Sequence, residues 1–217
     1  MKRIGFLHEQ IVSEENCRLA IINAAKHKKK RRNVQKVMDN LDFYAKDLSE
    51  RLVRLDFTSP YRTRIIKDGL SGKERELQIP AFYPDQCAHH AIVQVLQPLI
   101  MKSSYYWSCA NIPNRGIDRA AKGVERATMR DIKHAKYCVK MDIHKFYPSI
   151  PHDKLKEHLQ RKIKDKKALG IIHLVIDSYH SSPGHGIPIG NYTSPWLAEF
   201  YLQSLDYFIK QTLGIRY

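Results

Sequence analysis

Asp142 and Tyr147 lie five residues apart in the segment 136–151, and their carboxylate and phenol ring could belong to one binding or catalytic site. Positions 137, 139, 141 and 143 are apolar and alternate with polar side chains, which predicts a strand with one packed face. Asp142 then lies on the other face near the strand end, and two prolines close a bend around Tyr147. A carboxylate beside an aromatic ring suits a site for a divalent metal and a flat or sugar-bearing substrate. A solvated Asp ending an edge strand fits the same segment.

The charge of the chain indicates a polyanionic partner. With 217 residues it is long enough for one large domain or two small ones, and its formal net charge is +15. Such a surplus most often means nucleic acid, although a solubilising surface or a membrane-surface patch would also carry it. No basic amphipathic helix with a broad aromatic face, no membrane-length apolar run and no secretory leader pattern is visible. Nucleic acid is therefore the favoured partner, with no membrane.

The cysteines and histidines show no metal-binding spacing. The four cysteines are scattered without a CxxC pair, and the eleven histidines lack HxxxH or HExxH spacing. This pattern argues against a disulfide framework and a zinc ribbon. It favours a reducing compartment, and we expect a cytoplasmic protein.

Several helices are expected from apolar residues spaced three and four apart, and some carry cations. Their ranges are 9–27, 33–55, 85–96, 117–129, 152–164, 166–180 and 195–212. Between the first two lies an uninterrupted basic run of Lys28, Lys29, Lys30, Arg31 and Arg32. This run is as consistent with a solvated hinge as with phosphate contacts. Further candidates for nucleic-acid contact are Arg115, in a small basic turn, and Lys154 and Arg161, on a basic helix face.

Two connecting segments are candidates for nucleotide contact. Strands 63–67 and 75–79 flank a turn at 68–72, so that Lys67 and Arg75 could clamp a triphosphate. The stretch 183–191 holds three glycines and two prolines, which makes a stiff turn with exposed amides. It is not a Walker A loop, because no Gly-Lys-Ser/Thr follows.

Taken together, these segments resemble the motifs of reverse transcriptases in the family's order. DIHKFYPSIPH at 142–152 and GIPIGNYTSPWLAEFYLQSLD at 186–206 resemble its first two palm motifs. KERELQIPAFYPDQCAHHAIVQVLQPL at 73–99 is similar to its fingers motifs, and WSCANIPNRGIDRAAKGVE at 107–125 to the segment between them. The likeness is closest to the bacterial branch of group II intron-encoded, diversity-generating and phage- or defence-associated enzymes. Ile189 resembles the diversity-generating and some phage enzymes, whereas Pro195 matches the group II and retron pattern.

The resemblance implies an α+β fold, with the fingers and partial palm of a right-hand polymerase. It would be mostly helical with a small antiparallel sheet. The implied domains are an N-terminal helical basic extension at 1–56, fingers at 57–135 and a partial palm at 136–217.

The resemblance also gives the singled-out residues their roles. Asp142 would be the catalytic ligand of two Mg²⁺ ions, with the Ile143 backbone carbonyl beside it. Tyr147 would floor the nucleotide pocket as a steric gate against a 2′-hydroxyl. Arg75 and Lys67 would hold the nucleotide phosphates, and the loop containing Gly190 and Asn191 would pass close to the templating base pair. This interpretation requires Asp142 to lie at the mouth of a nucleotide pocket.

The implied function is RNA-directed DNA polymerisation on an RNA template with a DNA primer and deoxynucleotides. The family's Tyr-x-Asp-Asp motif does not occur before Tyr217. We therefore expect a fragment without activity on its own, with an exposed palm surface through which it could form a homodimer. A non-catalytic RNA- or DNA-binding module on the same scaffold is the alternative. An assembly protein using helix 195–212 as an interface is a third.

Overall fold

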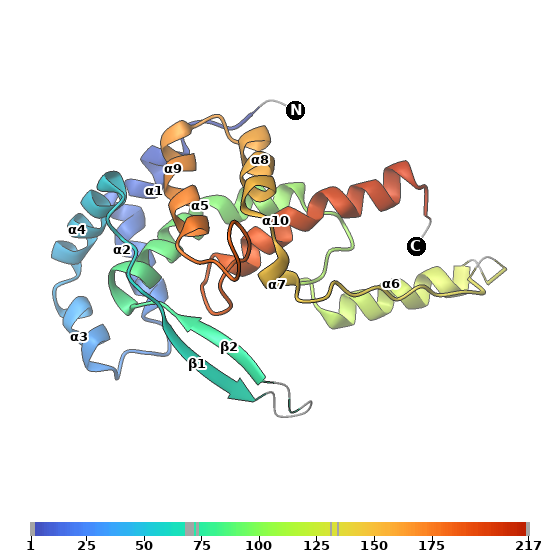
Figure 1. Cartoon of the computed structure of the whole chain (residues 1–217), viewed down its shortest axis with the longest axis horizontal. Helices are drawn as coiled ribbons and strands as arrows, with labels where there is room; N and C mark the ends of the chain where they lie inside the picture. Colours follow the sequence, from blue (N-terminus) through green and yellow to red (C-terminus); the bar gives the residue numbers. More distant parts are fainter. Residues whose placement is uncertain (1–2, 68–71, 73, 131, 134, 216–217) are drawn as a thin grey trace.

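Most of the chain is helical, as Figure 1 shows for this computed structural model. The structure describes residues 3–67, 72, 74–130, 132–133 and 135–215. Its α-helices are α1 (Leu7–Val12), α2 (Glu14–Ala24), α3 (Arg32–Asp39), α4 (Leu41–Arg54), α5 (Cys87–Ser103), α6 (Ile117–Arg130), α7 (Phe146–Ser149), α8 (His152–Lys162), α9 (Lys166–Asp177) and α10 (Ser194–Tyr207). Single π-helical turns are η1 (Phe82–Gln86) and η2 (Phe208–Thr212).

The first two expected helices are each broken by a residue that leaves the helical conformation. Ser13 separates α1 from α2 with φ −59° and ψ 139°, and Asn40 separates α3 from α4 with φ −125° and ψ 44°. The Ser13 hydroxyl accepts a hydrogen bond from the Asn16 amide at 3.2 Å, which caps α2. Short polar side chains compete in this way with the helical backbone bonds.

The expected hairpin is confirmed. Strands β1 (Arg62–Lys67) and β2 (Glu74–Ile79) pair antiparallel, with Arg62 opposite Ile79 and Lys67 opposite Glu74. Most of the predicted turn lies outside the described residues. Together with the helices, this small sheet gives the α+β class that the sequence predicts. No helix of the described residues is long and apolar enough to cross a membrane.

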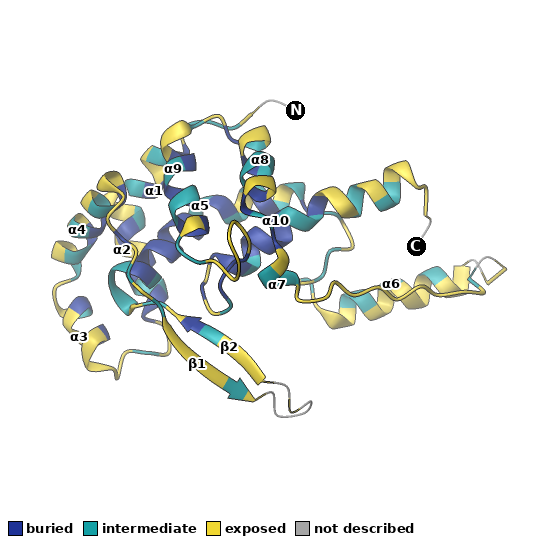
Figure 2. Cartoon of the chain, viewed as in Figure 1, coloured by how far each residue is buried: buried dark blue, intermediate teal, exposed yellow. Residues whose placement is uncertain are grey.

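One hydrophobic cluster runs through the body of the molecule. It joins buried residues of α1, α2, α4, α5, α8, α9 and α10, which Figure 2 shows in dark blue. It therefore crosses both expected boundaries, after residue 56 and after residue 135, so the three implied divisions share one core. The hairpin and α6 project from this body (Figure 1), and no described residue of α6 is buried.

The prediction of a strand at 136–143 is wrong for this structure. These residues form no ladder among the described parts of the chain, and Tyr137, Val139 and Met141 are 93%, 80% and 73% exposed. A strand is stable only when its backbone pairs with a neighbour. The described residues provide no such neighbour here, so the alternating pattern produces an extended segment.

Candidate nucleotide and nucleic-acid site

The segment around Tyr147 is bonded to the glycine-rich loop 183–191. The Ile187 amide donates to the Tyr147 carbonyl at 3.0 Å, and the Gly186 amide donates to the Ile150 carbonyl at 2.8 Å. Tyr147 is half-buried in α7, and burial raises the pKa of its phenol. The two stretches that the sequence singled out thus lie side by side, with a neutral aromatic ring at their junction.

His152 strengthens this junction, and the sequence analysis missed it. Its Nε2 lies 2.7 Å from the Gly186 carbonyl oxygen, and its Nδ1 lies 3.3 Å from Oδ1 of Asp177. Lys156 donates to the same carboxylate at 2.6 Å. Although burial acts in the opposite direction, Lys156 and His152 hold the pKa of Asp177 below its usual value. The signal in the sequence was a His directly after the second proline of the bend.

The far end of the loop joins the hairpin. The Gln78 amide in β2 donates to the Ile189 carbonyl at 2.8 Å. Gly190 has φ +124°, and a Cβ there would meet the Gln78 carbonyl oxygen at 2.6 Å, so this position requires glycine. Asn191 is buried, and its Nδ2 donates to the Tyr61 hydroxyl at 2.8 Å. These two residues therefore tie the loop to the body beside the hairpin.

Asp142 lines none of the clefts found among the described residues. Its side chain is exposed, and Ile143, whose carbonyl was the second expected ligand, is 44% exposed. Among the described residues no group of three or more His, Cys, Asp or Glu could hold a metal ion. Because the segment 136–143 pairs with no strand in the described part of the chain, no ladder there fixes the position of the Asp142 carboxylate. That geometric expectation is not met.

The two cations expected at the hairpin do not face the same side. Paired residues of an antiparallel ladder share a face. Arg75 pairs with Ile66 and Lys67 pairs with Glu74, so the side chains of Arg75 and Lys67 point to opposite faces. The Lys67 ammonium also lies 3.5 Å from the Glu74 carboxylate. A two-cation clamp on one phosphate group is therefore not formed, whereas one face carries the three arginines Arg62, Arg64 and Arg75.

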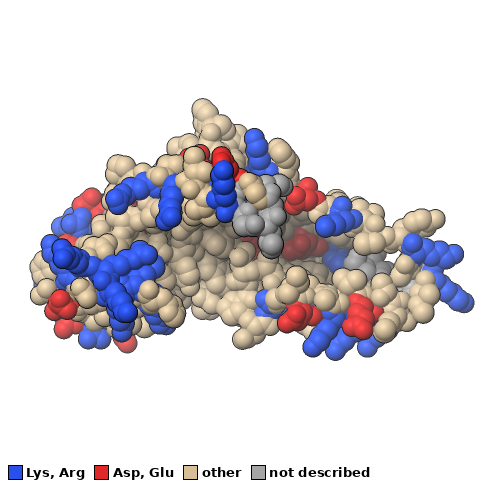
Figure 3. Space-filling model, turned by 90° about the horizontal axis from the view of Figure 1, so that it is seen from below, with Lys and Arg blue, Asp and Glu red and all other residues tan. Residues whose placement is uncertain are grey.

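A basic cleft of about 630 Å³ lies between the N-terminal helices and the base of the hairpin. Lys28 and Arg31 from the basic run line it, together with Arg62 and Gly190. Burial, with a smaller effect of Arg31, lowers the pKa of the Lys28 ammonium. On the face seen in Figure 3, Lys and Arg gather over this end of the molecule, beside a hollow of uncharged atoms. The remaining cations of the run, Lys29, Lys30 and Arg32, are exposed.

The other expected nucleic-acid contacts lie apart from this cleft. Lys154 and Arg161 both pair with Glu157 on α8, Lys154 at 3.3 Å. The Arg115 guanidinium donates to the backbone carbonyl of Tyr105 at 2.9 Å, so it supports a loop. The sequence analysis did not single out Lys36 or Arg62, which share the cleft with Lys28.

The fold and the motifs are those of a known class of protein. The model of the family "Reverse transcriptase (RNA-dependent DNA polymerase)" matches residues 67–217, and the chain belongs to this family.

Similar proteins include products of introns. The chain is 29% identical over 162 residues to the group II intron-encoded protein LtrA of Lactococcus lactis subsp. cremoris, covering 71% of this chain and 26% of that protein. It is 27% identical over 184 residues to an uncharacterised 91 kDa protein in the cob intron of Schizosaccharomyces pombe, covering 79% and 22%. The chain thus spans about a quarter of the length of these relatives.

Proposed function

We propose that the chain is the fingers and partial palm of an RNA-directed DNA polymerase, which adds deoxynucleotides to a primer 3′-hydroxyl on an RNA template. The observation that carries this proposal is the family match over residues 67–217, which contains both bonded stretches of the site. The intron-encoded relatives support a retroelement origin.

In this proposal three groups of described residues contact the nucleotide and the nucleic acid. The backbone of the half-buried Tyr147 is held by the Ile187 amide, and its ring is proposed to contact the sugar. The arginine face of the hairpin offers guanidinium groups, which bind phosphate oxygens in a bidentate manner. The basic cleft beside Gly190 provides positive charge for a nucleic-acid backbone.

Asp142 and the Ile143 carbonyl are hard oxygen donors of the kind that Mg²⁺ selects. In this proposal they supply only part of a magnesium donor set, and most of the octahedral shell is left to other oxygens. Two bound ions would stabilise the attacking hydroxyl and the leaving pyrophosphate in an in-line displacement. The part of Asp142 in this proposal is to hold metal beside the nucleotide.

Metal-dependent nucleotide binding tests this proposal. We expect the chain to bind a fluorescent deoxynucleotide in Mg²⁺ and to lose most of that binding in chelator. Asp142→Ala should weaken the Mg²⁺-dependent part about tenfold, because the loss of a charged oxygen ligand costs at least about 1.4 kcal/mol. Asp153→Ala, which removes an exposed acid of α8, is the matched control and should leave binding unchanged.

The exposure of Asp142 favours a second candidate, a non-catalytic RNA- or DNA-binding module on the same scaffold. RNA binding that weakens with salt but is indifferent to Asp142→Ala, without metal-dependent nucleotide binding, would support the module and contradict the polymerase. Homodimer formation and a cytoplasmic location stay predictions, as does the absence of activity in the isolated chain. Light scattering measures homodimer formation, and primer extension measures the activity of the isolated chain.

A further inference from the structure

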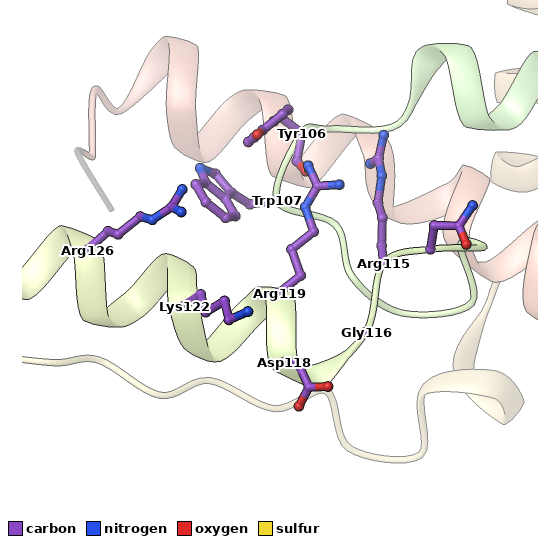
Figure 4. A pocket seen from close by; sticks show the side chains of 9 residues that line it. Tyr106, Trp107, Arg115, Gly116, Asp118, Arg119, Lys122 and Arg126 are labelled. Atoms are coloured by element: carbon purple, nitrogen blue, oxygen red, sulfur yellow. The ribbon is translucent and has the colours of Figure 1, made fainter.

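A second basic pocket, of about 510 Å³, lies outside the proposed nucleotide site. It is formed by the aromatic segment that precedes α6 and by one side of α6 itself (Figure 4). None of Asp142, Tyr147, Gly190 and Asn191 lines it. Four cations and a single acid, Asp118, surround the pocket, so its lining has a surplus of positive charge.

Two exposed aromatic rings form one wall. Tyr106 is 61% exposed and Trp107 is 40% exposed, and their centroids are 4.9 Å apart in an edge-on arrangement. The Arg119 guanidinium carbon lies 4.4 Å from the Tyr106 ring centroid, and Arg119 also donates to the Tyr106 carbonyl at 3.0 Å. Trp107 rests against Gly123, where a Cβ would meet the indole at 2.6 Å. The rings are therefore held in place while much of their surface faces solvent.

The facing wall is a line of cations. Arg119, Lys122 and Arg126 are three and seven residues apart on α6, which puts them on one side of the helix. Figure 4 shows Arg119 and Arg126 pointing from α6 toward the two aromatic side chains, and Asp118 pointing away from them. Both Lys122 and Arg126 are exposed. The cations of this wall would lose their hydration against an apolar partner, so this side of α6 suits an anionic one.

We propose that these aromatic rings and the cationic side of α6 bind single-stranded nucleic acid. An unpaired base stacks on the Trp107 indole, and the neighbouring phosphates contact Lys122 and Arg126. Every base has a stacking face, so such a site tolerates any sequence, whereas a duplex hides these faces within its own stack. Binding at this site involves no contact with a 2′-hydroxyl and requires no metal ion. The site extends the nucleic-acid surface beyond the proposed nucleotide site.

Tryptophan emission reports on this site directly. The chain has two tryptophans, and Trp196 is only 6% exposed, so it serves as an internal reference. Titration with oligo-U or oligo-dT of about 12 nucleotides should quench the emission of Trp107 in chelator as well as in Mg²⁺. A duplex of equal length should quench it much less. Loss of nucleotide binding in Asp142→Ala should leave this quenching intact, which separates the two proposals.

Substitutions with matched controls locate the binding. Measured by fluorescence anisotropy of labelled oligo-U, Trp107→Ala should weaken binding about tenfold, while Trp107→Phe should retain most of the affinity. Gly123→Ala should also weaken binding, since the added Cβ displaces the indole without removing it. Arg126→Gln should reduce the salt slope of log Kd by about one. Phe43→Ala and Lys46→Gln remove an exposed ring and an exposed cation from α4 and should change neither quantity.

The circular dichroism spectrum and the unfolding midpoint of each variant confirm that it folds. The proposal is overturned if single strands leave Trp107 emission unchanged. It is equally overturned if Trp107→Ala and Gly123→Ala bind as tightly as the parent chain, or if duplex and single strand quench alike.

Discussion

At the scale of single residues, the close packing of the loop 183–191 against the hairpin requires that residue 190 has no side chain. Gly190→Ala would place a Cβ 2.6 Å from the Gln78 carbonyl oxygen at φ +124°. We expect a loss of about 3 kcal/mol in the free energy of unfolding, from backbone strain and the enforced shift of β2. Urea unfolding followed by circular dichroism measures this loss.

Gly184 provides the control for that substitution. It also has a positive φ, +71°, but a Cβ there would meet no atom within 4 Å. Gly184→Ala should therefore cost only the left-handed strain, about 1 kcal/mol. If both variants lost the same stability, the close approach of the loop to the hairpin would not exist in solution.

At the scale of elements, Asp165 connects α1, near the N-terminus, to α9. Its carboxylate accepts hydrogen bonds from the Leu7 and His8 amides at 2.9 Å each, and from the Ala168 amide at 3.1 Å. It therefore caps α1 and α9 together. Asp165→Ala should cost about 2 to 3 kcal/mol, because several amides lose their acceptor at once.

Ser13→Ala is the comparison for Asp165, since Ser13 caps α2 alone through the Asn16 amide. We expect it to cost about 1 kcal/mol. Thermal or urea unfolding of both variants gives the difference. Equal losses would mean that Asp165 caps only α9 in solution.

The sequence predicts those elements whose stability is local. The hairpin follows from two short strands around a turn, and α6, α8 and α9 follow from apolar spacing. The strand at 136–143 could not be judged in this way, because it requires a partner that no local pattern reveals. The breaks at Ser13 and Asn40 were missed for the opposite reason, since the apolar period continues across them.

The same distinction holds for the candidate site. Tyr147 and the glycine-rich loop could be singled out from residue type, and the structure bonds them together. The Gln78 contact could not, because Gln78 comes from the hairpin, and His152, although it ends the same bend, carries no local sign that its imidazole reaches the Gly186 carbonyl. Lys67 and Arg75 point to opposite faces of the hairpin because of the strand register. A slip of one residue in that register would move each side chain of a strand to the other face, and the sequence alone does not fix it.

At the scale of the whole molecule, the pH dependence of stability tests how the body is packed around α5. His89 is buried, with its Nδ1 3.1 Å from the Thr193 hydroxyl, and His90 stacks on Tyr192 at a centroid distance of 4.0 Å. Burial lowers the pKa of His89 to about 3 and that of His90 to about 4. The charge of His90 also lowers the pKa of His89. The charges of Lys28 and Lys26 also lower the pKa of His90.

Both imidazoles are therefore neutral in the folded chain at pH 5, whereas the unfolded chain protonates them below about pH 6.5. The unfolded state then binds more protons, so the free energy of unfolding should fall as the pH drops from 6.5 toward 4. The expected slope is up to about 1.4 kcal/mol per pH unit for each histidine. Urea unfolding between pH 7.5 and about pH 5 covers this window. The Asp206 carboxyl, whose pKa is raised to about 6 by burial and by Glu199, acts on the slope with the opposite sign.

His89→Gln should remove close to one proton from that slope, because the amide is uncharged in both states. His144→Gln replaces an exposed histidine by the same side chain and is the matched control. An unchanged slope in His89→Gln would show that the imidazole is hydrated in the folded chain. The contact between α5 and Thr193, the residue before α10, would then be open to water.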